Sequence, residues 1–402
     1  MSNMSKDDIK LDELIERDRR FREDLDRLDP DWSVALFFNS IDMFYFTGTL
    51  QNGVYIVSRD DQSRLFVKRS YDRARIETPL EEVYPIKSFG DIKKYVNIRS
   101  GIAHIKKSAT PIEIWERFNK YFDFKEIRSM DRAILNTRAI KSDRELEFMK
   151  ESGRILENAL IEIPPLFLKP RVSELELGSE ILREMLLMGH EGICRMESFN
   201  SEMFLGDVNF GNNANYPNRH NGPAGLKGLS NASPLLGSRN RRLKDGDLIF
   251  LDMVCNYKGY YTDKTVVYSL GRTTDKIKDL HGTCLEIEQK IVSMLWDGEQ
   301  PARIYDEIYK QIDKDDKKFV NGFMGYGSNK VSFLGHGIGL VVDEYPVLAK
   351  GFNDPLKGNM TIAVEPKLSI KDIGMVGSEN TYVVAKSGGI SLTGKSKEII
   401  EI

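Results

Sequence analysis

The sequence predicts an α/β protein of two domains. A chain of 402 residues is longer than one hydrophobic core comfortably serves. Its first part alternates helical and strand-like patterns, and a new helical pattern begins near residue 140. We therefore expect one domain over residues 1–135 and a second over residues 136–402.

The first domain is expected to be a small α/β unit. Residues 11–28 carry a heavily charged helical pattern, and apolar strand-like segments follow at residues 32–39, 53–57 and 64–67. Strand and helix patterns then continue to Lys125. This alternation is typical of a sheet with helices packed on it.

Helix signals mark the start of the second domain. Ser142 and Glu145 have the spacing of a capping box ahead of a periodic apolar run. A second helix is expected from Ser173 to Met188, where Gly189 would end it.

The middle of the second domain contains a long segment without periodicity. Residues 209–242 are rich in Asn, Gly, Pro and Ser, so we expect an irregular loop, and loops of this length are usually functional. Two more helices are expected over about residues 276–296 and 304–312.

Composition and charge exclude several classes of partner. The chain is 41% hydrophobic and 30% charged, which is typical of a soluble globular protein. Its formal charge of −3 provides no global field for nucleic acid or an anionic membrane. No stretch approaches the ~18 consecutive apolar residues of a membrane span. We expect neither a nucleic-acid partner nor a membrane partner.

The cysteines and the N-terminus predict a cytoplasmic protein. Cys194, Cys255 and Cys284 are odd in number and widely spaced, which fits neither a disulfide framework nor a zinc knuckle. Residues 1–8 are polar and lack the apolar core of a signal peptide. Both observations favour a reducing compartment.

Two aspartates on neighbouring strands are the most informative feature of the sequence. A hairpin centred between Tyr257 and Lys258 would put Asp252 and Asp263 directly opposite each other. Opposed residues have Cβ atoms about 4.5–5.5 Å apart, where like charges destabilise a sheet. A divalent cation between the carboxylates would supply the missing positive charge. The alternative is a different register, in which both acids face water.

Three further candidate ligands follow toward the C-terminus. His336 lies between glycines that let the backbone pass close to a bound group. Glu365 ends one strand-like run and Glu379 begins another, and a turn at residues 371–373 would bring the two strands together. Singly, these residues suit a core histidine, a surface acid and a turn residue. Together with the aspartates they would form a cluster of four carboxylates and one imidazole.

The order and spacing of these five residues resemble a known metal site. It is that of the family containing methionine aminopeptidase, Xaa-Pro aminopeptidase and prolidase, in which a C-terminal pita-bread domain, a curved antiparallel sheet flanked by helices, holds two divalent metals. The resemblance implies that Asp263 and Glu379 bridge both metals. It also implies that Asp252 chelates one metal, and that His336 and Glu365 complete the other.

The resemblance extends over nearly the whole chain. Residues 39–48 resemble the creatinase-like N-terminal α/β domain of prolidase relatives, and residues 138–149 resemble the linker and first helix that follow it. Relatives are commonly dimers, so the resemblance implies a homodimer.

The chemistry follows from the ligands. An oxygen-rich site with one imidazole suits Mn²⁺, Fe²⁺, Co²⁺ or Zn²⁺, of which we favour Mn²⁺. Two metals about 3.5–4 Å apart can hold both the attacking and the departing atom. A water bridging them would attack a carbonyl carbon, and Glu365 is the candidate to take its proton and pass it to the leaving nitrogen.

The substrate side departs from the family pattern. Asn218 stands where prolidase-like members have a loop histidine, and His220 lies two residues further on. Asp343 replaces the second histidine, and an ionised aspartate only accepts hydrogen bonds. Gly377 replaces an arginine that can bind a substrate carboxylate. We treat Asn218, His220 and Asp343 as candidate substrate-binding residues.

Three functions are open at this point. The first is a metal-dependent aminopeptidase or dipeptidase of Xaa-Pro type with altered specificity, acting on a peptide. The second is a hydrolase or lyase of the same fold with a small non-peptide substrate. The third is a non-catalytic binding protein, against which the complete ligand set argues.

Overall fold

The computed structural model describes residues 9–98, 101–312 and 316–402, and the chain forms two compact units, Met1–Arg138 and Ala139–Ile402. The polar segment 1–8, which bears on the expected cytoplasmic location, lies outside the described residues. Among the described helices, none has the length and apolar character needed to cross a bilayer.

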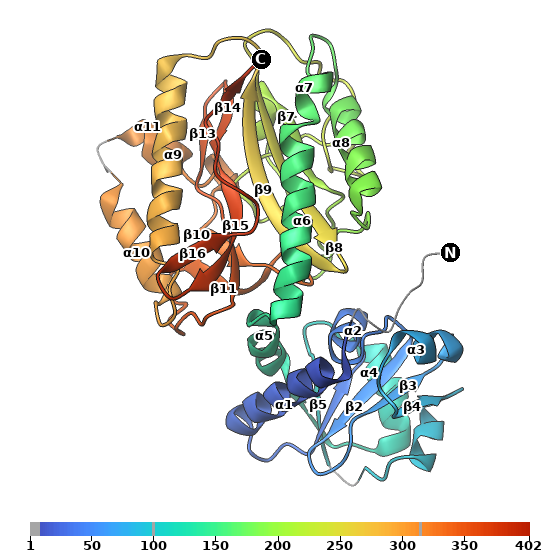
Figure 1. Cartoon of the computed structure of the whole chain (residues 1–402). Coiled ribbons are helices and arrows are strands. Elements are labelled where there is room, and N and C mark those ends of the chain that lie inside the picture. The colour runs from blue at the N-terminus through green and yellow to red at the C-terminus, as the bar shows by residue number, and fades with distance from the viewer. Residues whose placement is uncertain (1–8, 99–100, 313–315) are drawn as a thin grey trace. The chain divides into compact units, whose positions relative to one another are not determined.

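The first unit is a mixed six-stranded sheet with helices (Figure 1). The strand order is β4 (Val83–Pro85), β3 (Arg64–Val67), β2 (Gly53–Ser58), β1 (Val34–Phe37), β5 (Ile102–Ile105) and β6 (Glu126–Ser129). The helices are α1 (Leu11–Leu28), α2 (Ser40–Thr47), α3 (Tyr71–Glu77), α4 (Ile112–Phe122) and α5 (Asp131–Ala139). The small α/β unit expected from the sequence is confirmed, including the bounds of its first helix.

The second unit contains a curved nine-stranded sheet in which all pairs except β9–β17 are antiparallel. Its main path is β11 (Glu344–Ala349), β10 (Phe333–Gly337), β12 (Thr361–Val364), β15 (Glu379–Ala385), β9 (Tyr260–Ser269), β8 (Leu248–Tyr257) and β7 (Gly206–Phe210). Strand β16 (Gly388–Ser391) pairs with β15, and β17 (Ile400–Glu401) pairs with β9. A separate hairpin, β13 (Lys367–Ile370) and β14 (Gly374–Gly377), connects β12 to β15.

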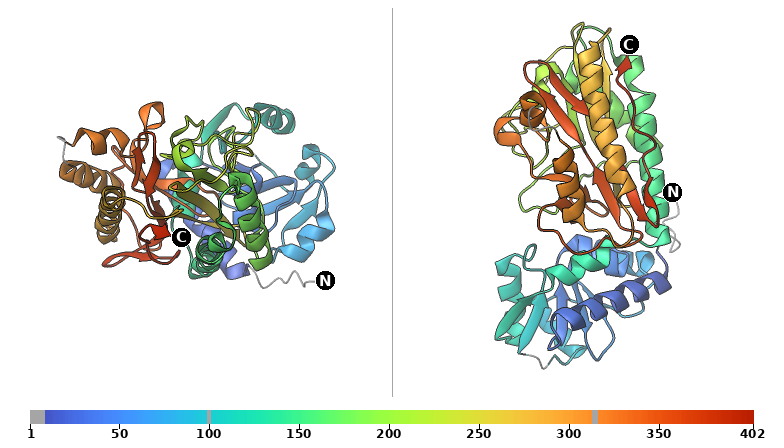
Figure 2. Two further views of the ribbon diagram at one scale, coloured as in Figure 1. Left: turned by 90° about the horizontal axis from the view of Figure 1, so that it is seen from above. Right: turned by 90° about the vertical axis from the view of Figure 1, so that its left-hand side faces the viewer.

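Helices flank this sheet in two groups, each with its own hydrophobic core (Figures 1 and 2). Helices α6 (Asp143–Ile161) and α8 (Glu174–Met188) pack with β7, β8 and β9, and the short α7 (Pro164–Phe167) joins them. Helices α9 (Asp275–Ser293), α10 (Pro301–Gln311) and α11 (Lys317–Gly322) pack with the half that contains β11 to β14. The predicted architecture, a curved antiparallel sheet flanked by helices, is confirmed.

The sequence signals for the starts of helices α6 and α8 correspond to capping hydrogen bonds in the structure. The Glu145 backbone N–H donates to Ser142 Oγ at 3.1 Å, and the Ser142 N–H donates to Glu145 Oε2 at 2.7 Å, which completes a capping box at the start of α6. Ser173 and Glu176 repeat the motif at α8, which ends at Gly189 with a left-handed φ of 116°.

The register predicted for the β8–β9 hairpin is wrong. Lys258 and Gly259 form a two-residue turn with positive φ values of 51° and 85°, so Tyr257 pairs with Tyr260. Asp252 therefore lies opposite Thr265, and Asp263 lies opposite Val254. The pairing differs by two residues from the prediction. Because side chains alternate with a period of two, both aspartates still point to one face.

Glu174 connects the start of α8 by hydrogen bonds to strand β7 and to the loop that follows β7. Its fully buried carboxylate accepts backbone N–H groups of Phe210 at 2.7 Å and Ser238 at 2.6 Å, one on each oxygen. The Glu174→Gln variant would present an amide donor to one of these N–H groups. We expect the free energy of unfolding to fall by about 1–3 kcal/mol, measured by urea denaturation. Glu180→Gln on the same helix, a partly exposed position whose side chain pairs with Arg183, serves as the control.

Candidate metal centre

One row of paired residues brings acidic side chains to the same face of four neighbouring strands. Asp207 on β7 pairs with Asp252 on β8, Asp252 pairs with Thr265 on β9, and Thr265 pairs with Glu379 on β15. Directly opposed residues of antiparallel strands have their side chains on one face. The row therefore places three carboxylates and the Thr265 hydroxyl on one face, and this hydroxyl donates to Asp252 Oδ1 at 2.6 Å.

A second row supplies the remaining aspartate and the imidazole. The Asp263 N–H donates to Thr381 Oγ1 at 2.8 Å, and this hydroxyl donates back to the Asp263 carbonyl at 3.1 Å. Thr381 pairs with Ala363 on β12, which pairs with His336 on β10. Residues far apart in sequence thus meet where the two rows run side by side.

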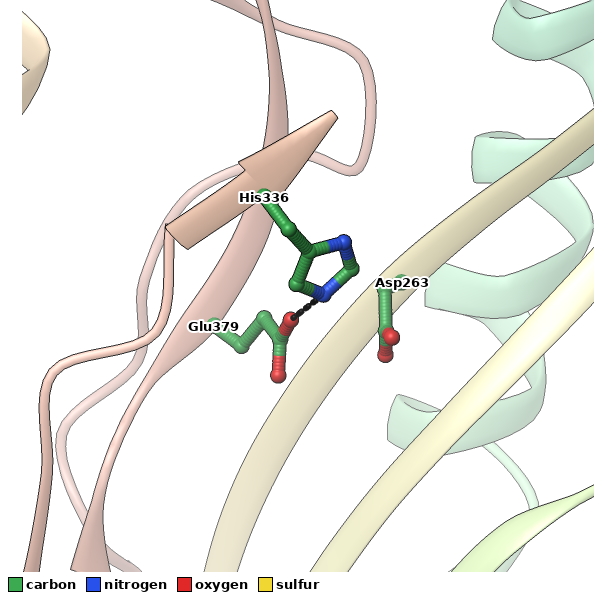
Figure 3. A group of neighbouring side chains, drawn as sticks. All are labelled: Asp263, His336 and Glu379. Carbon is green, nitrogen blue, oxygen red and sulfur yellow. Dashed lines mark ion pairs between the residues drawn. The ribbon is translucent and has the colours of Figure 1, made fainter. Parts of the chain in front are cut away.

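Asp263, His336 and Glu379 converge on one point (Figure 3). One ligand atom from each of the three lies within 4.8 Å of the others. His336 Nε2 is 3.9 Å from Glu379 Oε1 and 3.8 Å from Glu365 Oε1. Glu379 Oε1 is buried and has no hydrogen-bond partner. The structure brings together the predicted ligands of this half of the centre.

The arrangement fits one divalent ion. Atoms about 2.1 Å from a shared ion are up to about 4.2 Å apart, so the separations of 3.8 and 3.9 Å suit ligands of one ion and are too long for hydrogen bonds. An ion here would also satisfy Glu379 Oε1, whose burial without a partner is otherwise costly.

The carboxylates repel one another when no ion is bound. Burial, together with the charge of Asp252, raises the pKa of Asp263 well above its ordinary value, although Lys367 opposes the shift. Burial and the charge of Asp263 likewise raise the pKa of Glu379. Both shifts indicate that Lys367 does not offset all of the carboxylate charge, so a bound cation would stabilise the ionised forms.

Lys367 lies inside this cluster, and the sequence analysis missed it. Its Nζ donates to Asp252 Oδ2 at 2.7 Å, Glu365 Oε2 at 3.0 Å and Glu379 Oε2 at 2.5 Å. Burial alone would lower the pKa of Lys367, but these carboxylates raise it well above its ordinary value, so the side chain is an ammonium ion. The signal was present: a lysine two residues after a candidate ligand in an extended segment points to the same side.

Lys367 contacts a carboxylate that the prediction of two metals assigns to one of them. The resemblance assigns Asp252 to an ion that Asp263 and Glu379 share. In the structure both oxygens of Asp252 are taken, Oδ1 by Thr265 and Oδ2 by the ammonium. The residues fit one ion on the His336 side of the cluster and do not fit a second on the Asp252 side.

Asp207 is a further carboxylate that the sequence analysis missed. Burial and the charge of the opposed Asp252 raise the pKa of Asp207 well above its ordinary value. It belongs to β7, which begins just before the segment interpreted as loop. The sequence feature that could have indicated Asp207 is its position in a short segment between the apolar residues Leu205 and Val208.

The loop contains the candidate substrate residues Asn218 and His220. The pKa of His220 is lowered by burial, while the charges of Asp343 and Asp252 act on it in the opposite direction. The backbone N–H of His220 donates to Asn218 Oδ1 at 3.3 Å, and Asn218 Nδ2 is buried without a hydrogen-bond partner. The amide of Asn218 is therefore free to donate a hydrogen bond to a ligand.

Asp343 has a partner within the chain. Its Oδ1 accepts the Glu197 N–H at 2.7 Å, and its Oδ2 accepts the Ser198 hydroxyl at 2.8 Å. We expect the Asp343→Ala variant to exchange the Glu197 amide hydrogen at least about tenfold faster, because a hydrogen bond to a charged group contributes about 1.5–3 kcal/mol. Hydrogen exchange read by mass spectrometry measures this. Asp343→Asn keeps an acceptor and is the matched control.

Position 377 cannot hold the arginine that its place in the family pattern suggests. Gly377 has a φ of 125°, and a Cβ built on it would lie 2.4 Å from the Pro366 carbonyl oxygen. Glycine is required by this backbone conformation. Position 377 therefore offers no side chain that could bind a carboxylate.

Comparisons with known proteins agree with this geometry. The sequence model of metallopeptidase family M24 matches residues 147–386, and that of the creatinase/prolidase N-terminal domain matches residues 17–140. An Xaa-Pro dipeptidase of Pyrococcus furiosus is 24% identical over 362 residues, which cover 90% of this chain and 93% of the relative. An Xaa-Pro dipeptidase of Pyrococcus horikoshii is 24% identical over 393 residues, which cover 97% of this chain and 100% of the relative.

Solved structures show the same fold. The prolidase from Pyrococcus horikoshii superposes with a TM-score of 0.78 at 21% identity, covering 96% of this chain and 100% of that one. An Xaa-Pro dipeptidase from Bacillus anthracis gives a TM-score of 0.78 at 23% identity, covering 97% and 100%. At these identities the likeness establishes the architecture.

Proposed function

Since this chain belongs to metallopeptidase family M24, we propose that it is a metal-dependent dipeptidase or aminopeptidase of Xaa-Pro type. The convergence of Asp263, His336 and Glu379 on one point carries the proposal. The names of the two Pyrococcus relatives, which align over nearly the whole chain, support the choice of substrate.

The ligand set limits the divalent ions that would suit this site and the chemistry that they would supply. Carboxylate oxygens with one imidazole suit Mn²⁺, Fe²⁺, Co²⁺ or Zn²⁺, and we favour Mn²⁺. When bound, such an ion polarises a carbonyl and lowers the pKa of a water ligand. Asp263, His336, Glu365 and Glu379 would hold it.

Glu365 is proposed to move the proton. Its Oε2 is fixed by Lys367, while its Oε1 faces His336 Nε2 at the candidate ion position. A carboxylate held at the edge of that position can accept a proton from the attacking water and deliver it to the leaving nitrogen. Asn218 and His220 are proposed to contact the substrate.

A panel of peptides tests the proposal. Metal-loaded protein is expected to hydrolyse Xaa-Pro dipeptides or Xaa-Pro-Yaa tripeptides faster than Ala-Ala, with release of the first amino acid measured by chromatography. Mn²⁺, Co²⁺, Fe²⁺ and Zn²⁺ are each supplied. Failure to cleave any peptide with any of these ions would overturn the peptidase assignment.

Two observations favour a second candidate, a hydrolase or lyase for a small non-peptide substrate. Asp343 is hydrogen bonded to residues 197 and 198, and Gly377 leaves no arginine for a peptide carboxylate. Turnover of non-peptide amides, without turnover of peptides, would support this alternative.

We also propose a homodimer in the cytoplasm. All three cysteines are free, which suits a reducing compartment. Light scattering on purified protein checks the dimer, since a monomer mass near 46.0 kDa would contradict it.

A further inference from the structure

Lys367 divides the carboxylate cluster into two halves. Glu365 and Glu379 each direct Oε2 to the ammonium and Oε1 toward His336. Asp252 lies wholly on the ammonium side, because Lys367 and Thr265 take its two oxygens. The His336 side instead contains the unpartnered oxygen of Glu379. One half is thus satisfied by protein donors and the other is open to a ligand.

The ammonium half is complete as it stands. An ammonium has three N–H donors, and the three carboxylates use all of them. The side chain of Lys367 is 2% exposed, so it cannot move to water without rearrangement of the β13–β14 hairpin that begins with it. A divalent ion bound to Asp252 would need the same oxygens and would place a second cation against a buried one.

We propose that Lys367 is a permanent cation in place of one of the two ions of a dinuclear centre. The protein then binds one divalent ion, on Asp263, His336, Glu365 and Glu379. This inference rests on the proposed function only in requiring that an ion be bound. It explains how Asp252 and Glu379 lie side by side without a second ion, since Lys367 supplies the positive charge that the pair needs.

Metal stoichiometry of the unmodified protein tests the inference without any substrate. Titration with Mn²⁺, followed by elemental analysis after gel filtration, is expected to give one ion per chain. The electron paramagnetic resonance spectrum is expected to be the six-line signal of an isolated Mn²⁺ ion. Two ions per chain with a spin-coupled spectrum would overturn the role of Lys367 and leave the proposed function standing. No uptake would overturn both.

Removal of the ammonium provides the complementary measurement. In Lys367→Gly, uptake is expected to rise from one to two Mn²⁺ per chain, with spin coupling in the spectrum, because Asp252 Oδ2 and Glu379 Oε2 lose their donor. Lys371→Ala, at the exposed turn of the same hairpin, is the matched control and is expected to keep one ion. A folded Lys367→Gly protein that still binds one ion would contradict the inference, with folding checked by circular dichroism.

Discussion

Replacing Asp263 with asparagine is expected to abolish tight binding of a divalent ion and with it all hydrolysis. Asp263 faces both His336 and Glu379 at the candidate ion position. Outer-sphere partners of metal ligands already contribute about 10–100-fold to affinity or activity, so loss of a direct ligand should cost more than about 100-fold. Calorimetric titration with Mn²⁺ and a peptide assay measure the two losses separately.

The same variant should keep its fold when no metal is bound. Burial and Asp252 raise the pKa of Asp263 above its unfolded value, so the folded state binds this proton more tightly. Stability therefore falls as pH rises from the ordinary carboxyl pKa toward the raised one. Asparagine carries no titrating proton, and we expect a flatter dependence of the free energy of unfolding on pH.

A surface variant and a clear contrary outcome make the Asp263 test decisive. Asp279 is an exposed aspartate on α9, and Asp279→Asn should bind Mn²⁺ as the unmodified protein does. Unchanged Mn²⁺ affinity in Asp263→Asn would contradict the metal centre described here.

Replacing Glu365 with glutamine is expected to lower kcat by about 10²–10⁴-fold, the usual contribution of a general base. Glu365 Oε2 accepts a hydrogen bond from the Lys367 ammonium at 3.0 Å. Glutamine keeps the volume of the side chain and an oxygen that can accept this bond. It cannot accept the proton of the attacking water. Turnover of a saturating Xaa-Pro peptide, measured with the ion bound, tests this.

Two measurements separate a proton-transfer defect from loss of the ion. Elemental analysis of Glu365→Gln reports whether the ion is retained, and kcat measured on the metal-loaded variant reports the loss of proton transfer alone. Glu286→Gln, an exposed change on α9, controls for surface effects. An unchanged kcat in Glu365→Gln would remove Glu365 from the proposed mechanism.

Local patterns in the sequence predicted most of the fold. Ser142 with Glu145, and Gly189 after Met188, placed helix ends because capping and left-handed glycine are decided by neighbours in the chain. Alternation placed both Asp252 and Asp263 on one face, and this survived the wrong register because a shift of two residues preserves the face.

What the sequence by itself determined is the set of five residues that could hold a cation, since their chemical types and order are written in the chain. The tertiary structure decided what they meet. Lys367 and Asp207 approach Asp252 only because β7 pairs with β8 and the β13–β14 hairpin bends to the same face. Local alternation can indicate the side to which Lys367 or Asp207 points, but pairing between distant strands depends on the packing of the whole sheet.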